Sequence, residues 1–128
     1  MITWYFGNTG AGKSTEVDKR LQEGDVSAIL LDGDQLREGV NADLGLSPAD
    51  RRMNNMRTAH LAKLINDQGI DVIVSMITPY RSTRAYITEL CDPYWVYVEG
   101  GAPNTDETPF EVPEEGEYHH KLVGNVQC

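Results

Sequence analysis

The chain has 128 residues, a length that suits one domain and leaves little room for a second. Its 11 basic and 20 acidic residues give a formal charge of −9, which argues against a protein whose main task is to bind nucleic acid. No apolar run approaches the roughly 18 residues of a membrane span and no signal-peptide pattern opens the chain, so we expect a cytoplasmic protein without membrane contact. The two cysteines, Cys91 and Cys128, give no disulfide framework and no metal motif.

Apolar runs alternate with helical patterns along the first 98 residues. We expect strands at 2–6, 28–31, 71–76 and 94–98, and helices at 13–23 and 81–90. Another helix begins at Ser47-Pro48, a capping serine followed by proline, and Gly69 ends it. This alternation predicts a mainly parallel sheet covered on both faces, a three-layer α/β/α fold in one domain. After Glu99, Gly, Pro, Thr and Glu dominate, so residues 99–128 are predicted to be a loop and a tail.

A glycine-rich stretch at residues 7–14 fits the phosphate-binding pattern G-x-x-x-x-G-K-[ST]. The glycines let the backbone point its N–H groups at phosphate oxygens, and the following helix directs its positive end there. Lys13 adds a charge for the phosphates, and Ser14 offers a hydroxyl to magnesium. We therefore predict a site for ATP with Mg²⁺, formed by Gly7, Asn8, Thr9, Gly10, Ala11, Gly12, Lys13, Ser14 and Thr15.

Two acids, Asp32 and Asp34, follow the second predicted strand. They should lie at the carboxyl edge of the sheet, where ligands bind in open α/β folds. Carboxylates beside a triphosphate can hold magnesium and accept a proton from an attacking hydroxyl. A turn that merely carries acids is the alternative reading, because Asp and Gly favour turns.

Six of the seven arginines lie between residues 37 and 84. Arg51, Asn54 and Arg57 are spaced by three, so they share one side of a helix. Residues 75–81 leave the third strand at the same sheet edge as the acids. Together these groups could bind an anionic second substrate, although each single arginine could equally be solvated surface.

Several motifs follow one another in a specific order. Residues 31–45 read Leu-Asp-Gly-Asp-Gln-Leu-Arg-Glu-Gly-Val-Asn-Ala-Asp-Leu-Gly, and Ile-Thr-Pro-Tyr-Arg stands at 77–81. Between them lie Ser47, Asp50-Arg51, Asn54, Arg57 and Ala62-Lys63-Leu64. With the phosphate loop, this series over residues 2–98 resembles the adenylylsulfate kinase family.

The resemblance implies a P-loop NTPase fold and a reaction. The γ-phosphoryl of ATP would pass to the 3′-hydroxyl of adenosine 5′-phosphosulfate (APS), giving PAPS. Asp34 would be the general base, Lys13 would stabilise the phosphates, and Asp32 would support the metal together with Ser14. The residues expected to contact the acceptor are Asp34, Arg37, Asn41, Arg51, Asn54, Ile77, Thr78 and Arg81. Thr78 stands where the family has a serine that is sometimes described as phosphorylated.

The chain also departs from the family pattern. Leu46 replaces a phenylalanine that can stack on the substrate adenine, and Met53 and Met56 replace a glutamate and an arginine. After Glu99 about thirty residues of a substrate-covering lid are absent, and so is the final helix of the family. Three possibilities follow: slow PAPS synthesis, with a second copy covering the site as a homodimer; phosphorylation of another hydroxyl compound such as a nucleoside; or ATP binding without turnover.

The remaining candidates have simpler readings. We expect Tyr118-His119-His120 to be tail, His60 to be packing or surface, and Trp4 and Trp95 to be core. No Asn-Lys-x-Asp motif for reading guanine is present, which argues against a GTPase.

Overall fold

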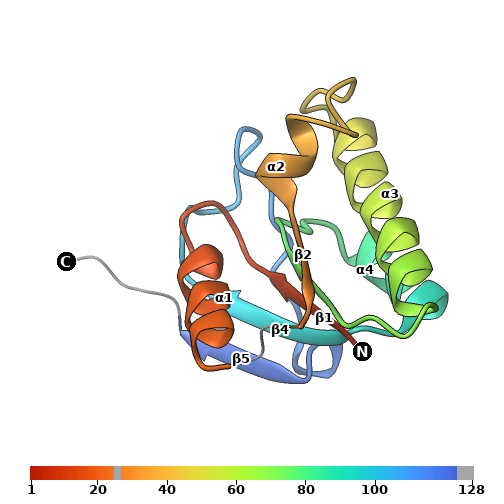
Figure 1. Ribbon diagram of the computed structural model, residues 1–128. Helices are drawn as coiled ribbons and strands as arrows, with labels where there is room; N and C mark the ends of the chain where they lie inside the picture. The colour runs from red at the N-terminus through yellow and green to blue at the C-terminus, as the bar shows by residue number, and fades with distance from the viewer. Residues whose placement is uncertain (25–26, 124–128) are drawn as a thin grey trace.

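The computed structural model describes residues 1–24 and 27–123, and within them five parallel strands form a sheet in the order β2-β3-β1-β4-β5 (Figure 1). In chain order the elements are β1 (Ile2–Phe6), α1 (Lys13–Gln22), β2 (Ile29–Asp32), α2 (Gly33–Arg37), α3 (Pro48–Asn66), β3 (Val72–Ser75), α4 (Arg81–Cys91), β4 (Tyr94–Glu99), the 3₁₀ turn η1 (Glu115–Glu117) and β5 (His120–Val123). The predicted parallel α/β fold is confirmed.

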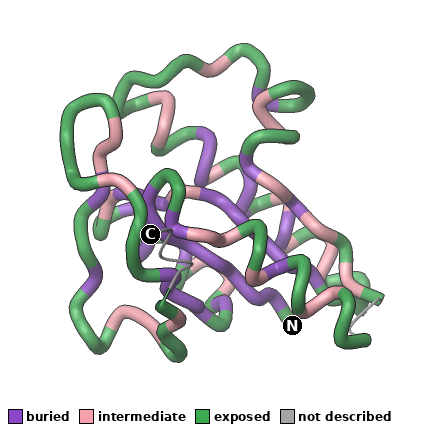
Figure 2. The backbone as a smooth tube through the Cα atoms, turned by 90° about the vertical axis from the view of Figure 1, so that its left-hand side faces the viewer, coloured by how far each residue is buried: buried purple, intermediate pink, exposed green. Residues whose placement is uncertain are grey.

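Both faces of the sheet are buried, which explains why its strands read as continuous apolar runs. On one face of the sheet, side chains such as Tyr5 and Val96 pack against α1 through Val17. On the opposite face, side chains such as Trp4 and Trp95 pack against α3 and α4. Figure 1 shows α1 on one side of the sheet and α3 with α4 on the other, and Figure 2 shows the buried backbone concentrated in the strands between them. The prediction that both tryptophans are core residues is confirmed.

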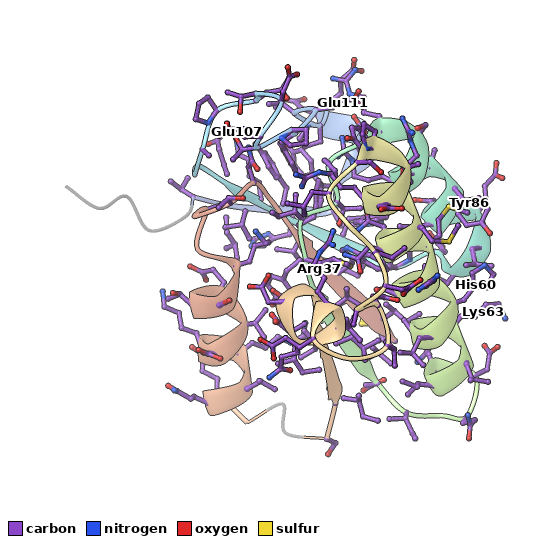
Figure 3. The ribbon with its side chains drawn as sticks, turned by 90° about the horizontal axis from the view of Figure 1, so that it is seen from above. Arg37, His60, Lys63, Tyr86, Glu107 and Glu111 are labelled. Carbon is purple, nitrogen blue, oxygen red and sulfur yellow. The ribbon has the colours of Figure 1, made fainter. Side chains whose placement is uncertain are left out.

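The predicted helix ends agree with the structure to within a few residues. The Ser47 side chain accepts a hydrogen bond from the backbone N–H of Asp50 at 3.1 Å, and Pro48 occupies the first turn of α3. His60 is exposed on α3 and bonds the Tyr86 hydroxyl at 3.0 Å, so its reading as a packing or surface residue is confirmed (Figure 3). Within the described residues, no helix combines the length and the apolar character of a membrane span.

The Asp32-Gly33-Asp34 segment is a strand end that turns directly into helix α2. Asp32 caps this helix, because its Oδ2 accepts a hydrogen bond from the Gln35 N–H at 3.2 Å. Gly33 allows the helix to lie against the exit of β3, since a Cβ atom there would be 2.8 Å from the Met76 Cβ. The cap and the close contact place both acids at the edge of the sheet.

The tail predicted after Glu99 is wrong for residues 115–123, which form η1 and the edge strand β5. His119 belongs to this ordered segment: its Nδ1 accepts a hydrogen bond from the Trp95 N–H at 3.0 Å, and its ring stacks on Tyr94. β5 has four residues and only Leu122 is half-buried, so no periodic pattern announced the strand. Residues 124–128 of the predicted tail, Cys128 among them, lie outside the described residues.

Arg84 holds the segment after β4 against α4. It is 2% exposed, and its guanidinium donates to the carbonyls of Thr78 at 2.6 Å and Glu111 at 2.8 Å and pairs with Glu117 at 3.3 Å. Burial lowers the pKa of this guanidinium, while the carboxylate of Glu117 opposes the shift. Arg84 is therefore a packing residue and not part of an anion pocket.

Candidate functional site

A cavity of about 610 Å³ opens at the carboxyl ends of the strands. The phosphate loop, the β2–α2 junction and the exit of β3 form its walls, together with Arg51 of α3 and residues of two loops. Its lining residues are Thr9, Gly10, Gly12, Lys13, Ser14, Thr15, Asp32, Gly33, Asp34, Arg37, Leu46, Arg51, Ser75, Met76, Ile77, Pro79 and Glu107. Eleven of the sequence-predicted residues meet here: Thr9, Gly10, Gly12, Lys13, Ser14, Thr15, Asp32, Asp34, Arg37, Arg51 and Ile77.

The phosphate loop needs its glycines for space and for backbone shape. A Cβ on Gly7 would lie 2.4 Å from the Val98 carbonyl oxygen, so any larger residue would push β1 and β4 apart. Gly12 has φ 103°, a left-handed conformation that favours glycine, and it caps α1. The N-terminus of α1 consequently opens into the cavity next to Lys13 and Ser14.

Lys13 folds back over its own loop. Its Nζ donates to the carbonyl oxygens of Gly7 at 2.8 Å and Asn8 at 3.2 Å. Burial lowers the pKa of this amine from 10.5 to about 8, and the carboxylates of Asp34 and Asp32 limit the shift. A half-buried ammonium with neighbouring acids can bind an anion that supplies more negative charge than the loop carbonyls do.

The donor set around Ser14 suits magnesium. The Ser14 hydroxyl and the carboxylates of Asp32 and Asp34 line the same cavity, and hard oxygen ligands are those that Mg²⁺ prefers. The described residues contain no cluster of three or more His, Cys, Asp or Glu side chains able to hold a metal. This sparse set fits an ion that takes one or two protein ligands and completes its shell with phosphate oxygens and water.

Two arginines also line the cavity, Arg37 from α2 and Arg51 from α3. Arg37 donates from Nη1 to the carbonyl oxygen of Gly45 at 3.0 Å. Arg51 donates from Nε to that of Leu46 at 2.9 Å and from Nη2 to that of Glu107 at 3.3 Å. Figure 3 shows Arg37 at α2, of which it is the last residue, and Glu107 on the loop that follows β4. Backbone carbonyls thus fix both guanidinium groups while leaving further donors for a ligand.

Four residues expected to contact the acceptor lie outside the cavity lining. Asn41 and Asn54 are buried and bond each other at 2.8 Å, so they brace the loop before α3. Arg81 pairs with Glu114 at 3.4 Å and Glu117 at 3.3 Å, and donates to the carbonyl of Val112. These acids belong to the segment after β4, so Arg81 stabilises that segment.

The fourth of these residues, Thr78, is 0% exposed. Its hydroxyl accepts a hydrogen bond from the Trp4 Nε1–H at 2.8 Å and donates to the Met76 carbonyl at 3.2 Å. A hydroxyl held in this way is unavailable for phosphorylation in the folded protein.

Three members of the predicted phosphate-binding set, Gly7, Asn8 and Ala11, are also absent from the cavity lining. The side chain of Asn8 bonds the loop after β4. Conversely, the cavity contains Ser75, Met76, Pro79 and Glu107, which the sequence analysis had not assigned. The first three could have been expected, because residues 75–81 leave β3 at this edge of the sheet. Glu107 could not, because no local pattern distinguishes one acid in a loop rich in Gly, Pro and Thr.

Comparison with known proteins matches residues 1–117 to the family model for adenylylsulphate kinase. The adenylyl-sulfate kinase of Paraburkholderia xenovorans is 44% identical over 105 residues, covering 80% of this chain and 59% of that protein. Two solved structures of the APS kinase CysC of Mycobacterium tuberculosis are also similar. One, in complex with AMPPNP and APS, is 40% identical with a TM-score of 0.68 and covers 77% of this chain and 61% of that chain. The other, a cysteine-to-alanine mutant, is 36% identical with a TM-score of 0.74, and the match covers 94% of this chain and 83% of that chain.

The chain is shorter than these relatives, and spans about half the length of the curated proteins it matches. The bifunctional enzyme NodQ of Rhizobium sp. strain BR816 is 34% identical over 150 positions that include 95% of this 128-residue chain and 24% of that protein. About 28 of those positions therefore have no counterpart here, a number close to the thirty or so residues that the sequence analysis expects to be absent. The solved relatives share the P-loop NTPase fold, and the chain belongs to the adenylylsulfate kinase family.

Proposed function

We propose that this protein transfers the γ-phosphoryl group of ATP to the 3′-hydroxyl of APS, releasing PAPS and ADP. One observation carries the proposal: a single cavity joins a phosphate loop, a pair of carboxylates and two arginines. Phosphoryl transfer requires these three kinds of group, because catalysis is mostly positioning and neutralisation of charge. The solved relative in complex with AMPPNP and APS supports the choice of substrates.

The phosphate-loop half of the cavity is assigned to ATP. Backbone N–H groups of residues 9–14 and the N-terminus of α1 would bind the β- and γ-phosphates, and Lys13 would turn from its loop carbonyls to them. Ser14 and Asp32 would hold Mg²⁺, which, when bound, neutralises charge between the phosphates. Asp32 is well placed because its cap to α2 fixes the orientation of its carboxylate.

The other half is assigned to the acceptor. Arg37 and Arg51 would bind its phosphosulfate group, because their guanidinium groups are already held at the cavity wall. Asp34 would accept the proton of the 3′-hydroxyl as that oxygen attacks the γ-phosphorus and the bond to the β-phosphate oxygen breaks. Ile77 adds an apolar contact at the exit of β3.

A second candidate acceptor is another hydroxyl compound such as a nucleoside. Two lining residues favour this alternative: Leu46, whose side chain is 65% exposed, and the acid Glu107, whose backbone carbonyl accepts a hydrogen bond from Arg51. A carboxylate on the acceptor side disfavours a strongly anionic substrate. That a second copy of the chain covers the acceptor half of the cavity stays a prediction.

The test is ADP release from Mg-ATP with and without APS, together with a direct assay for PAPS. ADP that depends on APS and matches PAPS mole for mole supports the proposal. If ATP binds but APS stimulates no ADP release, the assignment of the acceptor is wrong. The same assay with a panel of nucleosides then decides whether the second candidate holds or whether the protein binds ATP without turnover.

A further inference from the structure

Residues 100–108, here named the docked loop, lie directly against the phosphate loop. A Cβ on Gly101 would be 2.5 Å from the Thr9 carbonyl oxygen and 2.8 Å from the Ala11 nitrogen, so only glycine allows this approach. The Ala102 N–H donates to the same Thr9 oxygen at 2.8 Å. The docked loop is therefore in backbone contact with the residues proposed to bind phosphate.

A single side chain carries most of this attachment. Asn8 is 2% exposed, and its Nδ2 donates to the carbonyl oxygens of Ala102 at 2.9 Å, Pro103 at 3.3 Å and Thr108 at 3.0 Å. Its Oδ1 accepts a hydrogen bond from the Thr9 N–H at 2.8 Å. Both ends of the carboxamide are thus satisfied, one by the phosphate loop and the other by the docked loop.

The docked loop also reaches the acceptor half of the cavity. Glu107 lines the cavity, and its carbonyl oxygen accepts a hydrogen bond from Arg51, which bonds Leu46 as well. Hydrogen bonds therefore connect Thr9 to Asn8, Asn8 to the Thr108 carbonyl and the adjacent Glu107 carbonyl to Arg51, with the backbone of the docked loop joining the last two. None of these bonds requires contact with a ligand.

We propose that Asn8 is a positioning residue that couples the two halves of the cavity by holding the docked loop between them. A nucleotide that orders the phosphate loop would favour the docked state, and the docked state presents Arg51 to the acceptor. By linkage, the acceptor would favour nucleotide binding to the same extent. The coupling to the acceptor depends on the function proposed above, whereas the coupling to nucleotide does not.

The matched variants are Asn8→Asp and Asn104→Asp. Asn8→Asp keeps the size and the acceptor for the Thr9 N–H but loses the donors to three carbonyls. Asn104→Asp makes the same chemical change within the docked loop. Among residues 1–24 and 27–123, the Asn104 side chain uses only its oxygen, which accepts a hydrogen bond from the Phe110 N–H at 2.9 Å. Both variants add one negative charge, but only Asn8→Asp removes the donors that hold the docked loop and sets a carboxylate against its carbonyls.

Hydrogen exchange measures docking without any enzyme assay. We expect amides of the docked loop to exchange roughly ten- to hundredfold faster in Asn8→Asp than in Asn104→Asp, as loss of a buried donor predicts. Adding AMPPNP should slow exchange at 102–108 in the unaltered protein, but only at the phosphate loop in Asn8→Asp. Equal exchange in the two variants, or no effect of AMPPNP on the docked loop of the unaltered protein, would overturn the proposal. If Asn8→Asp does not fold, the effect of AMPPNP on exchange of the docked loop in the unaltered protein still tests the coupling to nucleotide.

Kinetics then test the coupling to the acceptor. At saturating ATP, Asn8→Asp should raise the KM for APS roughly tenfold relative to Asn104→Asp with a smaller change in kcat. Equal KM values alongside altered exchange would restrict Asn8 to the nucleotide half and overturn the coupling. If even the unaltered protein makes no PAPS, the function proposed above fails while the exchange data still decide whether Asn8 links nucleotide to the docked loop.

Discussion

The two halves of the cavity are built in different ways. The phosphate-loop half rests on the sheet, because Gly7 lies against the Val98 carbonyl of the neighbouring strand and Ala11 is buried beneath it. The half proposed for the acceptor takes its two arginines from α2 and α3, and carbonyls of loop residues 45, 46 and 107 hold them. The first half is therefore fixed by the fold itself, whereas the second can change its substrate through loop sequence while the fold is kept.

The largest effect should come from Asp34, which lines the cavity. Asp34→Asn removes the proposed proton acceptor and retains the shape of the side chain. We expect kcat to fall by roughly 10² to 10⁴ with nucleotide affinity nearly unchanged. Steady-state kinetics and an AMPPNP titration measure the two quantities. Full turnover in this variant would move the general base elsewhere in the cavity.

Lys13 tests the phosphate-loop half alone. Lys13→Ala should lower kcat by about 10² to 10³, because a positioned charge on the transferred phosphoryl group is lost, and should weaken ATP binding as well. Lys19→Ala, on the exposed side of α1, is the control and should behave as the unaltered protein. Unchanged ATP affinity in Lys13→Ala would contradict the phosphate-binding assignment.

Arg51 and Arg81 test the acceptor half as a pair. Arg51 lines the cavity, whereas Arg81 pairs with Glu114 and Glu117 outside it. We expect Arg51→Ala to raise the KM for APS about 10- to 100-fold, as loss of charged hydrogen bonds predicts, with the KM for ATP little changed. Arg81→Ala should leave both KM values alone. The reverse pattern would restore the assignment of Arg81 to the acceptor.

The lowered pKa of Lys13, about 8, gives ATP binding a pH dependence. Above this pH the free protein must take up a proton to bind phosphate, so affinity should fall by up to about tenfold per pH unit toward pH 10. Between pH 8 and 10.5 the unfolded chain binds more protons, so the Lys13 contribution to the free energy of unfolding rises with pH. Lys13→Arg, which stays charged, should lose the dependence; a decline retained there would place the titrating group elsewhere.

The smallest effect on turnover is expected for Thr78. Thr78→Val leaves the Trp4 indole N–H without its buried acceptor, which should lower the free energy of unfolding by about 1–3 kcal/mol in urea titrations. Thr88→Val removes the acceptor of the Trp95 indole N–H at a part-buried position, where water can substitute, and should have a smaller effect. Turnover should be retained in Thr78→Val, and phosphate transferred to Thr78 of the unaltered protein would refute its structural role.

The elements that carry their own signal could be predicted from sequence. The strand at residues 2–6 is a largely apolar run and was found with correct bounds. The phosphate loop is a local pattern, and six of the nine residues predicted from it line the cavity. The cap at Ser47 is equally local. The predictions that failed concern residues whose roles depend on partners far away in the sequence. Arg84 bonds Glu117, 33 residues away, and Asn8 bonds Thr108, 100 residues away. Residue type alone made Arg84 a candidate for an anion pocket and Asn8 a phosphate-loop residue like its neighbours.

The bonds of Asn8 have a consequence for chain length. This one side chain binds Ala102 and Pro103 at one end of a loop and Thr108 at the other, and the Thr108 hydroxyl also bonds the Pro103 carbonyl at 2.8 Å. These bonds hold the two ends of the loop together and do not involve the side chains of residues 104–107. Each doubling of the intervening length would add only about 0.6 kcal/mol of closure entropy. Segments of very different size can therefore be inserted at residues 104–107 without disturbing the sheet, which makes this the position at which to graft a longer cover over the cavity.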